Sequence, residues 1–180
     1  ARGFLTSTDV DGFWLANHWG ETTYVDGGRL QDVRDARPEL VFPVIETAGG
    51  RQTSAMLINP HRVEATAVVT LMGNSGTVKA APLMLALPGR ARRVLEMQVV
   101  FPEAEPDDYL HVQADQGLLG TAFFGPPQAL ACVEALPVTG SGPALYCPHV
   151  ACGDFGVTFS SELLLVNPGK AASSATVELR

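Results

Sequence analysis

The chain has 180 residues, of which 46% are hydrophobic and 17% charged, with 18 glycines and 13 prolines. This composition is typical of an all-β globular protein rather than a disordered or helical chain, and the length allows one or two domains. A net charge of −7 argues against nucleic acid and anionic membrane as partners, and no run of about 18 apolar residues predicts a membrane span.

The first residues predict a β-hairpin that recurs later in the chain. Residues 4–20 align with residues 109–125 at an offset of 125 − 20 = 105. Each stretch has a strand pattern on both sides of a glycine, at Asp11-Gly12 and Gln116-Gly117, and glycine supplies the positive φ of a tight turn. The chain begins at Ala1 without methionine, so we interpret it as a mature or excised piece.

Polar segments rich in proline, glycine and charge follow both hairpins, over residues 21–38 and 126–143. Clusters of these residue types mark exposed connections between packed units. We therefore expect module boundaries there.

The longest repeated stretch covers residues 40–71 and 145–179. Asn59-Pro60 matches Asn167-Pro168 at an offset of 167 − 59 = 108, so the later copy has a loop about three residues longer. In both copies an apolar strand precedes Asn-Pro, over Ser54–Ile58 and Glu162–Val166, because proline cannot continue a hydrogen-bonded ladder.

An alternating strand follows each Asn-Pro. The alternation predicts that Val69 and Leu71 point inward in the first copy, and that Val177 and Leu179 do so in the second.

The remaining segments complete one unit. A turn at residues 74–76 leads to residues 77–87, which Pro82 restricts to an edge or bulged strand. After the Pro88-Gly89 turn, residues 90–100 predict a strand with a helical turn at its start.

These elements predict an all-β fold of tandem immunoglobulin-like β-sandwich modules, with roughly seven strands in a repeat of about 105 residues. Residues 1–37 would be the trailing strands of one repeat, residues 38–142 a full repeat, and residues 143–180 the leading strands of a further repeat. The two partial repeats could complete each other within one chain or between chains.

The paired motifs resemble a repeat found in large secreted or surface proteins of bacteria. The resemblance is carried by Pro148-His149, by residues 163–168 and 110–115, by Leu87-Pro88-Gly89 and by Phe124-Gly125. It implies an extracellular array of β-sandwiches and no catalytic residues. Val44 stands where the second copy has His149, so this histidine is not shared by the two copies.

Two groups of residues are candidates for metal binding or covalent chemistry. Asp9 and Asp11 could offer carboxylates to a weakly bound calcium ion, although Asp11-Gly12 is also a simple turn sequence. Cys147 and Cys152 favour a disulfide if the loop between them turns, over buried thiols and, last, a zinc site that includes Cys132.

Trp14, Trp19 and Tyr24 lie close together in the sequence and could stack on a sugar if exposed, although the repeat favours packing for both tryptophans. The sequence predicts a non-catalytic protein that needs no cofactor, and the resemblance implies that it is extracellular or at the cell surface. It would be a stalk, adhesin spacer or filament subunit that contacts itself or neighbouring repeats. The alternative is a carbohydrate-binding module with polysaccharide as its partner.

Overall fold

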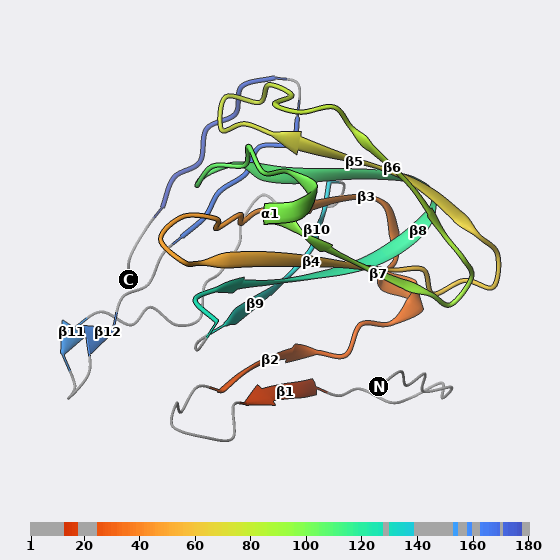
Figure 1. Ribbon diagram of the computed structural model, residues 1–180, viewed down its shortest axis with the longest axis horizontal. Helices are drawn as coiled ribbons and strands as arrows, with labels where there is room; N and C mark the ends of the chain where they lie inside the picture. The colour runs from red at the N-terminus through yellow and green to blue at the C-terminus, as the bar shows by residue number, and fades with distance from the viewer. Residues whose placement is uncertain are drawn as a thin grey trace.

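The computed structural model describes residues 13–17, 25–127, 130–138, 153–154, 158–159, 163–169 and 171–177, and the side chains of residues 13–17, 25, 26, 153, 154, 158 and 159 are not among the described parts. Strands dominate the described chain (Figure 1). They are β1 (Phe13–Asn17), β2 (Val25–Arg29), β3 (Arg37–Phe42), β4 (Gln52–Ile58), β5 (Ala65–Met72), β6 (Leu83–Leu87), β7 (Arg92–Glu96), β8 (Tyr109–Gly125), β9 (Ala131–Glu134), β10 (Leu136–Pro137), β11 (Gly153–Asp154) and β12 (Thr158–Phe159). Two short helical turns, η1 (Val33–Asp35) and α1 (Met97–Val100), join strands. The fold is all-β, as the sequence predicts.

The long strand β8 organises the sheet. Its first half pairs antiparallel with β3 on one edge and β5 on the other, and its second half pairs with β9 and β4. The strands β10, β6 and β7 then extend the sheet by pairing with β3, β5 and β4 respectively. The described residues thus contain one eight-stranded antiparallel sheet and two separate strand pairs, β1–β2 and β11–β12.

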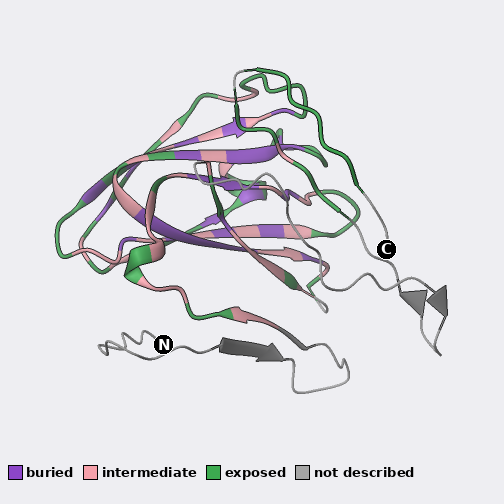
Figure 2. Ribbon diagram, turned by 180° about the vertical axis from the view of Figure 1, so that it is seen from behind, coloured by how far each residue is buried: buried purple, intermediate pink, exposed green. Residues whose placement is uncertain are grey.

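The two groups of strands carried by β8 meet in one hydrophobic core (Figure 2). In β5 the residues Ala65, Ala67, Val69 and Leu71 are fully buried, and those between them are partly or fully exposed. This period of two confirms the predicted inward positions of Val69 and Leu71. Each fully buried aliphatic side chain of this size stabilises the fold by about 1.5–3 kcal/mol.

The predicted hairpin over residues 109–125 is wrong, because β8 is one continuous strand. The glycine that suggested a turn has another role. A Cβ atom at Gly117 would lie 3.1 Å from the backbone of Ala36, and the φ of Gly117 is not positive. The glycine allows the chain just before β3 to approach β8 closely, where the register between the two strands shifts.

Two other expectations need correction. The helical turn predicted at the start of residues 90–100 lies at the end, as α1, after strand β7. Near the C-terminus, residues 163–166 and 175–177 belong to no strand, and Leu163, Leu165 and Val177 are exposed. Their apolar alternation resembles that of β4 and β5, but none of the described strands pairs with them.

The Asn-Pro turns of the two copies have the same hydrogen bonds. Asn59 Oδ1 accepts from the His61 backbone N–H at 3.0 Å, and Asn59 Nδ2 donates to the Val63 carbonyl at 2.8 Å. Asn167 makes the same two bonds, from the Gly169 N–H at 3.0 Å and to the Ala171 carbonyl at 2.8 Å. The side-chain amide therefore shapes both turns locally, whatever packs around them.

Candidate interaction interface

Most of the candidate residues from the sequence lie outside the described residues. This holds for Asp9 and Asp11, for Trp19 and Tyr24, and for Cys147 and Cys152. Trp14 lies in β1, but its side chain is not described. The calcium, aromatic and disulfide sites therefore stay predictions.

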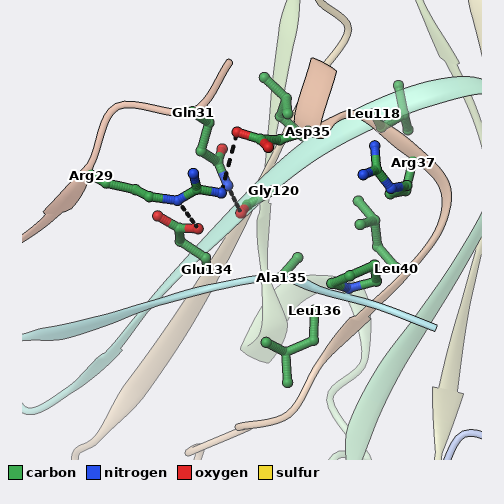
Figure 3. Close-up of a pocket in the computed structure, with 12 residues that line it drawn as sticks. Arg29, Gln31, Asp35, Arg37, Leu40, Leu118, Gly120, Glu134, Ala135 and Leu136 are labelled. Atoms are coloured by element: carbon green, nitrogen blue, oxygen red, sulfur yellow. Dashed lines mark hydrogen bonds and ion pairs between the residues drawn. The ribbon is translucent and has the colours of Figure 1, made fainter. Parts of the chain in front are cut away.

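A hollow among the described residues lies where the segment from β2 to β3 crosses the second half of β8 (Figure 3). It has a volume of about 380 Å³. Its lining combines apolar residues of β3 and β8–β10 with four charged side chains, and consists of Arg29, Gln31, Asp35, Arg37, Leu40, Leu118, Leu119, Gly120, Glu134, Ala135, Leu136 and Pro137. The hollow lies between the segment from β2 to β3 and the main sheet.

Arg29 at the end of β2 is the centre of this site. Its Nη2 atom lies 3.2 Å from Asp35 Oδ2, and its Nε atom lies 3.4 Å from Glu134 Oε2 on β9. Asp35 foremost, and then Glu134, raise the pKa of the Arg29 guanidinium above its ordinary value. Because the Arg29 side chain is 58% exposed, each ion pair contributes only about 0.2–1 kcal/mol. The pairs set the orientation of β2 more than they stabilise the protein.

The local fold of η1 holds Asp35 in place. Asp32 caps this turn by accepting from the Arg34 N–H at 2.7 Å, and Asp35 Oδ2 accepts from the Asp32 N–H at 3.0 Å. The hydrogen bonds from Arg34 lower the pKa of Asp32 to about 2. The same Asp35 oxygen that completes the capping box also faces Arg29, so this carboxylate is oriented before it meets the arginine.

A second contact ties the segment to β8. Gln31 Nε2 donates to the Gly120 carbonyl at 3.1 Å, and the same oxygen accepts from the Ala135 N–H at 2.9 Å. No side chain fits at this point, because a Cβ at Gly120 would lie 2.7 Å from Phe42 Cζ and 2.8 Å from Ala135 Cβ. Glycine therefore lets β8, β3 and the residue after β9 come together beneath the hollow.

The contacts between β2 and β9 join positions that the sequence comparison makes equivalent. Cys132 Sγ donates to the Gly27 carbonyl at 3.3 Å, and Glu134 pairs with Arg29. Both contacts have the same spacing, 132 − 27 = 134 − 29 = 105, which is the offset of the two copies. Contacts that advance together on both strands mean that β2 and β9 lie side by side in the same direction (Figure 1). Each of them also pairs with its own antiparallel neighbour, β1 or β8.

The site's residues were treated as a polar linker by the sequence reasoning, which missed Arg29, Asp35 and Glu134. Two signals were present in the sequence. One is the Asp32-x-x-Asp35 capping pattern, and the other is the opposite charge of Arg29 and Glu134 at equivalent positions.

The chemistry of the hollow is that of paired charges. Its polar lining consists of two arginines, two carboxylates and an amide, arranged to hold segments together. Among the described residues, no group of three or more His, Cys, Asp or Glu side chains could hold a metal ion. No helix among the same residues has the length and apolar character needed to cross a membrane.

Comparisons with known proteins identify a family whose function is unknown. The model of the "Family of unknown function (DUF5719)" matches residues 34–123, half of the 180 residues. No curated protein matches the sequence.

Two solved structures match part of this chain. The crystal structure of Thermotoga maritima 1070 has a TM-score of 0.48 at 10% identity, covering 59% of this chain and 99% of that chain. The Anabaena sensory rhodopsin transducer has a TM-score of 0.38 at 14% identity, covering 47% of this chain and 91% of that chain. Likenesses at this level carry no argument about function.

Proposed function

We propose that this chain, which belongs to the DUF5719 family of unknown function, is a non-catalytic structural protein of the cell surface. In this proposal the chain consists of tandem immunoglobulin-like modules of about 105 residues. Its function is to form an array, as a stalk, spacer or filament subunit, through contacts between modules.

The observation that carries the proposal is the contact between β2 and β9. The ion pair between Arg29 and Glu134 and the bond from Cys132 to Gly27 both join equivalent positions of two successive copies. Contacts between equivalent strands are what a protein built from like units uses when each unit packs against its neighbour. Binding of a small molecule does not require contacts between equivalent positions of two copies.

The hollow beside this contact supports the same reading. Its four charged side chains come from β2, η1, β3 and β9 and carry two positive and two negative charges, and Arg29 pairs with both carboxylates. Opposite charges at the rim of an interface fix its register and its partner more than its affinity. The cell-surface location rests on the resemblance of the repeated motifs to those of secreted bacterial arrays.

A double-mutant cycle on Arg29 and Glu134 tests the packing of modules. We expect R29A and E134A each to speed amide hydrogen exchange in β2, and the double variant to add little beyond R29A, which already removes the ion pairs with both Asp35 and Glu134. The coupling should correspond to about 0.2–1 kcal/mol in the opening free energy of β2.

The matched control is R51A. Arg51 pairs with Glu46 at 2.7 Å inside the main sheet unit, so its loss should leave exchange in β2 unchanged. Equal exchange in β2 of the wild type and both single variants would contradict packing through this contact. Labelling of intact cells with a membrane-impermeant amine reagent tests the location, and a protein that reacts only after lysis would refute it.

A further inference from the structure

An exposed apolar segment near the C-terminus is the feature least explained by the fold of a single chain. Leu163, Leu164 and Leu165 are 56%, 41% and 62% exposed. Their equivalents at the offset of 108 are Ala55, Met56 and Leu57 of β4, two of which are fully buried. Three consecutive leucines in water favour association with another surface.

The turn that follows this segment already has the shape it has in the main unit. Asn167 makes the same two hydrogen bonds within its turn that Asn59 makes after β4. Asn59 makes further bonds that Asn167 does not show within the described chain, to the carbonyls of Leu87 at 2.9 Å and Pro88 at 3.4 Å. The C-terminal segment is thus preshaped like β4 and its turn, but lacks the strand that β4 packs beside.

The strand beside β4 is the second half of β8, and its equivalent in this chain is β1. Leu118–Ala122 of β8 correspond to Phe13–Asn17 at the offset of 105. The second half of β8 holds β9 on one edge and β4 on the other. β1 holds β2, the equivalent of β9, on one edge, and no described strand pairs with its other edge.

We propose that residues 163–166 of one copy of this chain add to β1 of a second copy as an antiparallel strand. The register follows from the pairing of Ile58 with Leu119, because 58 + 108 = 166 and 119 − 105 = 14. Val166 therefore lies opposite Trp14, and the next pairs along are Leu165 with Leu15, Leu164 with Ala16 and Leu163 with Asn17.

The occupant is a second copy for two reasons. Residues 163–166 and β1 of the same chain are not paired in its structure. In addition, the repeat provides both the strand and the edge with complementary registers over four consecutive residues, which an unrelated partner would not. Strand addition lets both segments complete their backbone hydrogen bonds. This inference rests on the proposed function, because it supplies the contact by which an array would grow.

Isotope-mixed photo-crosslinking tests the pairing. The full chain carrying benzoylphenylalanine in place of Leu165 is prepared with natural and with ¹⁵N isotopes, and the two preparations are mixed and irradiated. We expect crosslinks to residues 14–16 that join one light and one heavy chain. Crosslinks only within chains of one isotope would overturn the second copy as the partner, and crosslinks to other residues would overturn the register.

Sedimentation of a charge variant gives an independent readout. We expect L165K to weaken self-association by roughly tenfold or more, which corresponds to 1.4 kcal/mol or more. The matched control is M84K on β6, because Met84 is 63% exposed and Leu165 is 62% exposed. Equal self-association of the wild type and L165K, or a wild type that stays monomeric at its solubility limit, would refute the inference. A failure of this inference would leave the coupling between Arg29 and Glu134 unchanged. The proposed function is therefore tested separately, by the double-mutant cycle on those two residues.

Discussion

Replacing Asn59 by alanine should destabilise the protein far more than the same change at Asn167. The Asn59 side chain is fully buried, accepts from the His61 N–H, and donates to the carbonyls of Val63, Leu87 and Pro88. Alanine would remove this partner from the His61 N–H and from the carbonyls of Val63 and Leu87, whereas the Pro88 carbonyl still accepts from the Ala91 N–H at 3.1 Å. At about 1–3 kcal/mol for each unsatisfied group, reduced where water can enter, the loss is about 3 kcal/mol or more.

Asn167 is the matched control, because it makes the same two bonds within its turn but is exposed. Water can replace both bonds, so N167A should stay within about 0.5 kcal/mol of the wild type. The measurement is urea unfolding followed by circular dichroism, with the free energies compared at equal slopes. A domain of this size has about 5–15 kcal/mol in total, so the N59A effect would be a large fraction. N59A and N167A with equal unfolding free energies would refute the view that the Asn59 side chain links the turn to the end of β6.

Two further predictions concern packing and pH. G120A should lower the free energy of unfolding by about 1–3 kcal/mol, because the added Cβ would lie 2.7 Å from Phe42 Cζ. A melting temperature equal to that of the wild type would contradict the close approach of these two residues. Lys79 Nζ lies 2.6 Å from Glu105 Oε2 and 3.0 Å from Asp108 Oδ2, which lowers the pKa of Glu105 below its ordinary 4.5 and raises the pKa of Lys79 above its ordinary 10.5. The lowered pKa of Glu105 stabilises the folded protein above pH 4.5, and this stabilisation is lost as the pH falls through the pKa of the folded state. The raised pKa of Lys79 stabilises the folded protein below pH 10.5, and this stabilisation is lost as the pH rises through the pKa of the folded state. K79M should therefore be less stable than the wild type between these limits in a pH series of unfolding experiments, with a difference that shrinks in acid; a difference independent of pH would argue against the ion pair.

Local chemistry determined the parts of this structure that the sequence alone could predict. The alternation in β5 requires one buried face, so Val69 and Leu71 could be placed inward without knowing what covers them. The Asn-Pro turns at Asn59 and Asn167 form through bonds within five residues, so the same sequence gives the same turn when buried or exposed. The all-β class follows from the same short-range patterns.

Tertiary contacts determined where strands continue, which strands lie side by side and which apolar side chains are buried. Gly117 is compatible with either a tight turn or a close approach, and the structure shows that β8 continues through it while Ala36 lies close by. The opposite charges of Arg29 and Glu134 at equivalent positions are compatible with a contact, but only the assembled fold brings these two side chains, 105 residues apart, together. The leucines at residues 163–165 have the pattern of a buried strand, yet burial depends on a partner that the described chain does not provide. Sequence periodicity thus determines which face of a strand is apolar, and the assembled fold determines whether that face and its edges find a partner.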